Sequence, residues 1–149
     1  MSAYRTIVVG TDGSDTSLAA VDRAASVAAD SAAELVIVCA YTPAGRDDTA
    51  DAEDALKDEA YLVVGWTPAE ETLRTAEERA IKAGAANIRT VAADGPPADV
   101  LRKAADDARA DLLVVGNRGL NTLSGRILGS VPSDVARRSG VDVLIVHTT

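Results

Sequence analysis

Five short apolar runs divide the chain, and most of them are rich in β-branched residues. Residues 35–40 form a continuous apolar run, as expected for a strand that helices bury on both faces of a parallel sheet. Residues 4–10 lead into the turn sequence Thr-Asp-Gly, which is typical of the end of a strand. The predicted strands cover residues 4–10, 35–40, 88–93, 111–115 and 141–147.

Between these runs, apolar side chains recur at the three- to four-residue spacing of amphipathic helices. Ser14 is a good N-cap for the first helix, which we expect to end near Asp30 or Ser31. Pro68 suits the first turn of the second helix, and Gly84 follows its end. Two more helices are predicted over residues 98–110 and 131–139. This alternation predicts an α/β fold, a doubly wound, open, five-stranded parallel sheet with helices on both faces.

The length of 149 residues suits a single domain, residues 1–149, with a core large enough to need no disulfide or structural metal. The periodic pattern is interrupted over residues 43–60, which are crowded with Asp and Glu. We interpret this stretch as an acidic, variable surface loop.

Charge and cysteine content exclude several classes of function. The formal net charge of −8 would repel nucleic acid, and no apolar run reaches the roughly 18 residues that span a bilayer. The amino terminus lacks the apolar segment of a secretion signal, and Cys39 is the single cysteine. We therefore expect a cytoplasmic protein with neither a nucleic acid nor a membrane as partner.

The carboxyl ends of parallel strands are where ligands bind in open α/β sheets, at the point where the strand order reverses. Three predicted strands end in residues that could serve a ligand there. These candidates are Gly10, Thr11 and Asp12 after the first strand, Ala40 after the second, and Gly116, Asn117, Arg118 and Gly119 after the fourth.

The glycine-rich segment after the fourth strand predicts a phosphate site. Gly116 and Gly119 would let backbone amides approach a ligand, and Gly129 and Ser130 place free amides and a hydroxyl at the start of a helix. The alternative is that these are ordinary turn glycines between a strand and a helix. Four such positions in register favour phosphate binding.

Asp12 and Arg118 are the charged candidates. Asp12 could accept a hydrogen bond from a ribose hydroxyl or an adenine amino group, or help to hold a divalent ion such as Mg²⁺ beside phosphates. A turn-forming or helix-capping aspartate explains it almost as well. Arg118 could pair with phosphate oxygens, and an exposed loop arginine is an equal alternative.

The motifs of catalytic sites are missing. No G-x-x-x-x-G-K-[ST] sequence supplies a phosphate-binding lysine, and no G-x-G-x-x-G follows the first strand. His147, the single histidine, lies in the last predicted strand, so it is a poor candidate for a general base. We assign no catalytic residue.

The opening sequence, residues 7–14 (IVVGTDGS), and the spacing G-x2-G-x9-G-S from Gly116 to Ser130 resemble those of the universal stress protein family. The residues before and within the last strand are also similar, so that the resemblance covers nearly the whole chain. It implies a Rossmann-like sheet of the adenine nucleotide alpha hydrolase type and, because the glycine signature is complete, ATP binding. Some members bind cyclic AMP, which the sequence leaves open.

Residue roles follow from the resemblance. Asp12 and the Ala40 region correspond to contacts with adenine and ribose, and Gly116 and Gly119 to the ribose and phosphate turn. Gly129, Ser130 and the amide of Val131 correspond to the phosphate site. The resemblance also implies a homodimer joined through the last strand, with an edge formed by Val141, Val143 and Ile145.

Three hypotheses remain at this point. The first is a stress-response sensor or regulator that binds an adenine nucleotide with little or no catalysis. The second is a slow ATPase or phosphotransferase that uses Asp12 and a divalent ion. The third is a dimeric interaction module whose nucleotide site is vestigial.

Overall fold

The structure is a computed structural model that describes residues 3–42, 66–117, 130–138 and 140–148. The described strands are β1 (Thr6–Gly10), β2 (Glu34–Tyr41), β3 (Asn87–Asp94), β4 (Leu112–Gly116) and β5 (Asp142–Val146). The described helices are α1 (Asp15–Ser31), α3 (Trp66–Lys82), α4 (Pro97–Ala108) and α5 (Ser130–Arg138). Each predicted strand and helix is present, with ends that differ by at most a few residues. The predicted acidic loop, residues 43–60, lies outside the described residues.

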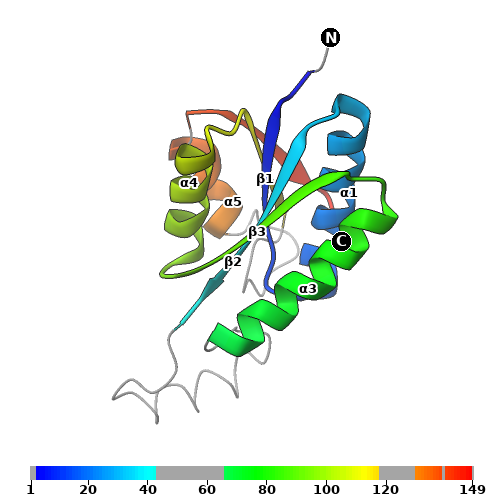
Figure 1. Cartoon of the computed structure of the whole chain (residues 1–149). Helices are drawn as coiled ribbons and strands as arrows, with labels where there is room; N and C mark the ends of the chain where they lie inside the picture. Colours follow the sequence, from blue (N-terminus) through cyan, green and yellow to red (C-terminus); the bar gives the residue numbers. More distant parts are fainter. Residues whose placement is uncertain (1–2, 43–65, 118–129, 139, 149) are drawn as a thin grey trace.

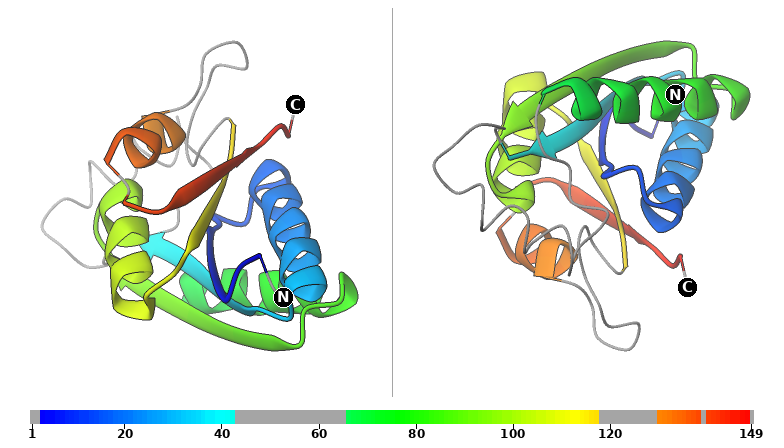
Figure 2. Two further views of the ribbon diagram at one scale, coloured as in Figure 1. Left: turned by 90° about the horizontal axis from the view of Figure 1, so that it is seen from above. Right: turned by 90° about the horizontal axis from the view of Figure 1, so that it is seen from below.

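All five strands belong to one parallel sheet in the order β3-β2-β1-β4-β5. Helices α1 and α3 cover one face of the sheet, and α4 and α5 cover the other (Figures 1 and 2). The predicted fold class is therefore confirmed. The central position of β1 explains why its sequence is almost entirely apolar, since it is covered on both faces.

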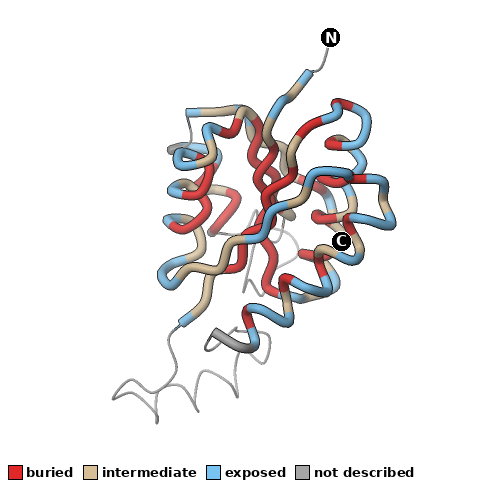
Figure 3. The backbone as a smooth tube through the Cα atoms, in the orientation of Figure 1, coloured by how far each residue is buried: buried red, intermediate tan, exposed pale blue. Residues whose placement is uncertain are grey.

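The core has two halves, one on each side of the sheet (Figure 3). Ile7 and Val9 of β1 pack toward α1 and α3, while Val8 packs toward α4 and α5. Alternate residues of a strand face opposite sides of a sheet, so one short strand contributes to both halves. Helix α1 can lie close against the sheet because half of its buried residues are alanines: Ala20, Ala24, Ala25 and Ala28.

The start of α1 and the end of α3 follow local signals, whereas α1 and α4 each end at a left-handed residue other than glycine, Ala32 (φ 53°) in the case of α1. The Ser14 side chain caps α1 by accepting a hydrogen bond from the Ser17 amide, and Gly84 follows α3 with a φ of 108°, both as predicted. Helix α4 ends earlier than predicted, because Arg109 adopts a left-handed conformation with a φ of 54°. Such a conformation is uncommon for a residue other than glycine, and the sequence therefore gives no signal for it.

Within the described parts of the chain, no helix is both long enough and apolar enough to cross a membrane.

Candidate functional site

The candidate site lies where β1 and β4 meet. The two strands are neighbours in the sheet, yet the helix that follows β1 covers one face and the helix that follows β4 covers the other. In folds of this type, a reversal of this kind opens a ligand-binding crevice beyond the carboxyl ends of the two strands. The structure brings the predicted residues Gly10 to Asp12 and Gly116 to Asn117 to its two sides.

The turn after β1 is fixed by a network of buried hydroxyl groups. Thr11 has no exposed surface, and its Oγ1 lies 2.8 Å from Oγ of Ser17. The same Thr11 oxygen accepts a hydrogen bond from the Gly13 amide at 3.1 Å. The Thr11 side chain therefore stabilises the turn and points into the protein.

Asp12 both shapes the turn and presents an acceptor. Its Oδ1 accepts a hydrogen bond from the Ser14 amide at 2.9 Å, and its own amide donates to Oγ of Ser17 at 3.3 Å. The turn-forming role weighed from the sequence is thus present. No described residue donates to the second carboxylate oxygen, Oδ2, and Asp12 keeps 8% of its surface exposed. A ligand hydroxyl or amino group could bind this oxygen.

The opposite side of the crevice, formed by Gly116 and Asn117, is hydrogen-bonded to residues near the carboxyl terminus of the chain. The Asn117 amide donates to the carbonyl of Val146 at 2.7 Å. Its side-chain Oδ1 accepts two hydrogen bonds from Thr148, one from the amide at 2.8 Å and one from the hydroxyl at 3.0 Å. The two residues that begin the glycine-rich segment are therefore held by residues at the end of β5 and just beyond it.

Ala40 lies at the carboxyl end of β2, beside Ala93 of β3, and is partly buried on the α4 side of the sheet. Its neighbour Cys39 is buried on the other side. Burial, and to a lesser degree the negative charge of Asp12, raises the pKa of the Cys39 thiol to about 12. The thiol therefore stays protonated and unreactive in the folded protein.

Several predicted residues cannot be placed in the crevice. Arg118, Gly119 and Gly129 lie outside the described residues. Ser130 is the first residue of α5, and Val131 follows it. The Val131 side chain is only 5% exposed and packs in the core, so its backbone amide is the group that could face a ligand.

The predicted dimer edge is at the margin of the sheet. Strand β5 pairs with β4 on one side, and no other described strand pairs with it. Val143 and Ile145, as well as Val141 just before the strand, are partly buried against the α4 and α5 side of the core. Pairing of this edge with a second chain stays a prediction.

Within the described residues, no group of three or more His, Cys, Asp or Glu side chains could hold a metal ion. Asp12 alone could supply one ligand oxygen. This suits a Mg²⁺ ion that takes its other ligands from water and from the phosphates of a nucleotide.

Three residues of the site were missed from the sequence. Ser17 closes the network at Thr11 and Asp12, and its position one turn after Ser14 was a usable signal. Thr148 contacts Asn117, and both it and the carbonyl of Thr16 lie within 4 Å of where a Cβ on Gly116 would be. The Thr148 contacts depend on the pairing of β5 with β4, and the Thr16 contact depends on the packing of α1 beside β4. No local pattern reveals either of these.

Comparison with known proteins identifies the family. The model of the universal stress protein family matches residues 3–147. A universal stress protein of Mycobacterium tuberculosis is 57% identical over 149 residues, which is the full length of both chains. The chain therefore belongs to the universal stress protein family.

Solved structures of relatives include two with a nucleotide. A universal stress protein in complex with cAMP is 51% identical, with a TM-score of 0.76, over 99% of this chain and 100% of the other. The universal stress protein from Archaeoglobus fulgidus in complex with dAMP is 25% identical, with a TM-score of 0.67, over 95% of this chain and 97% of the other.

Proposed function

We propose that this protein binds an adenine nucleotide in the crevice between the carboxyl ends of β1 and β4, and that it senses the nucleotide rather than turning it over. The observation that carries the proposal is the meeting of the Asp12 turn and the Gly116 segment at the switch point of the sheet. The cAMP and dAMP complexes of related proteins support it.

The described residues suggest how adenosine would be held. Oδ2 of Asp12 would accept a hydrogen bond from a ribose hydroxyl or from the adenine amino group, since Oδ1 is already engaged by the Ser14 amide. Ala40 would lie beside the base at the end of β2. Its small side chain would leave room there.

The phosphates would lie at the glycine-rich side of the crevice. The amides of Ser130 and Val131 are in the first turn of α5, where unpaired N–H groups and the positive end of the helix dipole favour anions. Gly116 would contribute its backbone amide, together with Arg118, Gly119 and Gly129 of the same segment, whereas the Asn117 amide already donates to the carbonyl of Val146.

Two nucleotides compete for this assignment. The complete glycine signature favours ATP, whose phosphate chain could reach from Gly116 to Ser130. The relative in complex with cAMP favours the cyclic nucleotide, whose single phosphate could rest near Gly116 alone. Mg²⁺ would be needed only for ATP, with Asp12 as one ligand. Both nucleotides share the adenosine on which the proposal rests.

Catalysis is not part of the leading proposal. Hydrolysis needs a positioned base, and in the described part of the crevice Asp12 is the one ionisable side chain suited to that role. Its Oδ1 is already occupied by the Ser14 amide. We therefore expect at most slow ATP hydrolysis.

The β5 edge would join two chains, so that nucleotide occupancy could affect the dimer.

Isothermal titration calorimetry tests this proposal. We expect saturable binding of cAMP or ATP and no binding of GTP. Asp12→Asn keeps an acceptor for the Ser14 amide and removes the charge, so it should weaken binding several-fold without unfolding the turn. Asp15→Asn removes a charge from an exposed residue in the first turn of α1 and serves as the matched control. Absence of heat with both adenine nucleotides would refute the proposal.

A further inference from the structure

Strand β3 forms one margin of the described sheet, and no described strand pairs with its outer side. It pairs with β2 on the other side. It has eight residues, and none of them is buried. Arg89 forms an ion pair with Glu34. The residues between Arg89 and Asp94, which are residues 90–93, carry no charge. Long uncharged edges are usually shortened or covered, because their free backbone groups pair readily with another strand.

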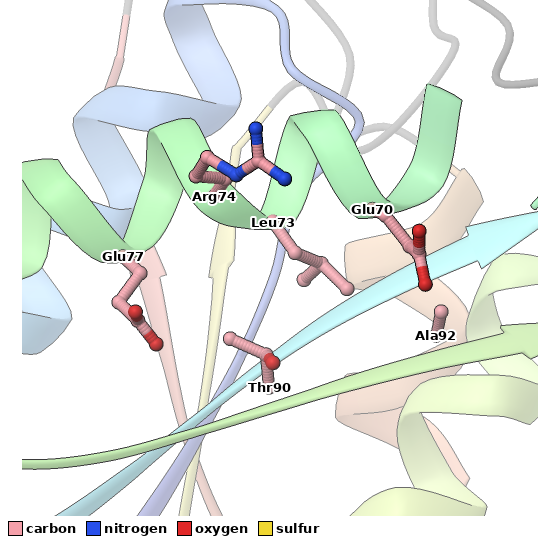
Figure 4. A pocket seen from close by; sticks show the side chains of 6 residues that line it. All are labelled: Glu70, Leu73, Arg74, Glu77, Thr90 and Ala92. Atoms are coloured by element: carbon pink, nitrogen blue, oxygen red, sulfur yellow. The ribbon is translucent and has the colours of Figure 1, made fainter. Parts of the chain in front are cut away.

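A cavity of about 360 Å³ lies between β3 and α3. Figure 4 shows that the carboxylates of Glu70 and Glu77 extend from α3 toward the strand, while the Arg74 guanidinium points away from it. Neither glutamate forms an ion pair with a described residue. The lining residues are Glu70, Leu73, Arg74, Glu77, Thr90 and Ala92. This cavity therefore presents negative charge beside the open edge.

A second cavity, of about 350 Å³, lies on the other face of the same strand, against α4. Its apolar surface comes from Val91, Ala93, Val100 and Ala104. Among the acidic residues at its margin, Asp107 pairs with Lys103 at 3.0 Å. Asp94 forms no ion pair with a described residue. This second cavity is mainly apolar with a weakly acidic margin.

The two cavities match the alternation of a strand. Thr90 and Ala92 line the cavity on the α3 side, and Val91 and Ala93 line the one on the α4 side. A chain paired with the outer edge of β3 would also alternate its side chains between the two faces. Successive side chains of that chain would therefore enter an acidic cavity and an apolar cavity in turn.

We infer that the outer edge of β3 binds an extended peptide segment of a partner protein, in which basic residues facing α3 alternate with apolar residues facing α4. Backbone pairing with β3 would supply affinity, and the two cavities would supply specificity, as in other cases of strand addition to a sheet edge. The inference is independent of nucleotide binding.

Charge decides the nature of the partner. Two copies of this chain carry a formal net charge of −8 each, and pairing β3 with β3 would bring the acidic cavities of both copies together. Like charges across such an edge are destabilising. A basic segment instead places its lysines or arginines opposite Glu70 and Glu77.

The spacing of the two glutamates limits the sequence of the segment. They are seven residues apart on α3, which corresponds to about 10 Å along the helix. Side chains on one face of a strand recur about every 7 Å. Long basic side chains two or four positions apart could therefore reach the two carboxylates.

A short peptide that alternates lysine and valine, labelled with a fluorophore, is a suitable probe, and a glutamate–valine peptide is its control. We expect the lysine peptide to bind saturably by fluorescence anisotropy and the glutamate peptide not to bind. In ¹H–¹⁵N NMR spectra, the amide signals of residues 88–94 should shift. The inference would be overturned if the lysine peptide did not bind, or if it shifted only amide signals outside residues 88–94.

Two double variants separate a specific site from general attraction to an acidic protein. Glu70→Gln with Glu77→Gln should weaken peptide binding roughly three- to tenfold, as expected for the loss of two exposed ion pairs. Glu71→Gln with Glu78→Gln removes the same charge at the same spacing from exposed positions outside the cavity, and should have little effect. Equal losses in both would contradict the inference.

Backbone pairing is tested with two lysine–valine peptides, one methylated on the lysine backbone nitrogens and the other on the valine backbone nitrogens. Because the amides of alternate residues point to opposite edges of a strand, only one of the two peptides loses the donors that face β3, and it should bind more weakly than the other. Sedimentation of the free protein tests whether a second copy of this chain occupies the edge of β3 instead of a peptide. A dimer of the wild-type chain that blocks the peptide, and whose interface maps to β3 by NMR, would show that a second copy occupies the edge and would overturn the inference.

Discussion

At the scale of single residues, the glycines at the ends of the two central strands have different roles. A Cβ on Gly10 would lie 2.7 Å from Cδ2 of Leu101, which is 1% exposed and held in the core. A Cβ on Gly116 would meet Thr148 at 3.5 Å and the carbonyl of Thr16 at 3.8 Å, which are ordinary contact distances. Gly10 is thus required for the packing of α4, whereas the described surroundings of Gly116 would accept a side chain.

We therefore predict that Gly10→Ala lowers the free energy of unfolding by about 1–3 kcal/mol through overpacking, and that Gly116→Ala changes it by less than about 1 kcal/mol. Urea denaturation of the two variants measures both values. If Gly116→Ala weakens nucleotide binding while the fold is intact, the missing Cβ serves the ligand. Equal destabilisation by the two substitutions would contradict the assignment.

The hydrogen bonds between Asn117 and Thr148 give a second prediction at this scale. Thr148→Val removes the hydroxyl donor but keeps the shape and the backbone amide, so it should weaken nucleotide binding by loosening the start of the glycine-rich segment. A hydrogen bond of this kind contributes about 1 kcal/mol, which corresponds to roughly a fivefold loss of affinity.

Thr148→Ser retains the hydroxyl and should restore the affinity, and calorimetry compares the two variants. Wild-type affinity in Thr148→Val would show that the contact with Asn117 does not position the nucleotide segment.

At the scale of elements, the amino ends of β1 and β4 are joined by Asp111. Its carboxylate accepts hydrogen bonds from the amides of Arg5 and Thr6, at distances between 3.0 and 3.2 Å. Burial acts to raise the pKa of this carboxyl group, but the hydrogen bonds from the amides of Thr6, Arg5 and Asp111 itself keep it below the ordinary value of 3.8. The ionised form therefore stabilises the start of both central strands.

Because the pKa of Asp111 is lowered on folding, its contribution is complete above the ordinary carboxyl value and is lost as the pH falls through the lower folded-state value. We predict that Asp111→Asn destabilises the protein at neutral pH and reduces the loss of stability in acid. Urea denaturation between neutral pH and pH values below 3.8 measures the slope. An unchanged slope in the variant would contradict this role.

Much of this architecture could be predicted from the sequence, since apolar runs and helical spacing are local signals. The cap at Ser14 and the glycine after α3 were found for the same reason. The end of α4 at Arg109 was not, because a left-handed conformation of arginine has no sequence signal. The contact of Thr148 with Asn117 could not be found either, because it joins segments 31 residues apart in the sequence through the pairing of β4 with β5.

At the scale of the whole molecule, the sheet separates two regions with different proposed tasks. The crevice at the carboxyl ends of β1 and β4 would hold the nucleotide, and the open margin at β3 would hold a peptide. Strand β2 lies between β1 and β3, and the two regions share no described residue. A nucleotide that binds only the folded state should also raise its stability by an amount that grows with the logarithm of the nucleotide concentration above Kd.

The most direct test of the central claim is an NMR titration of the ¹⁵N-labelled protein with cAMP, repeated with ATP. We predict saturable shifts of the amide signals of Thr11, Asp12, Gly13, Gly116 and Asn117 with at least one nucleotide, while those of Thr90 and Ala92 at the β3 margin stay in place. No saturable shift with either nucleotide, or shifts confined to residues away from the crevice, would contradict the account.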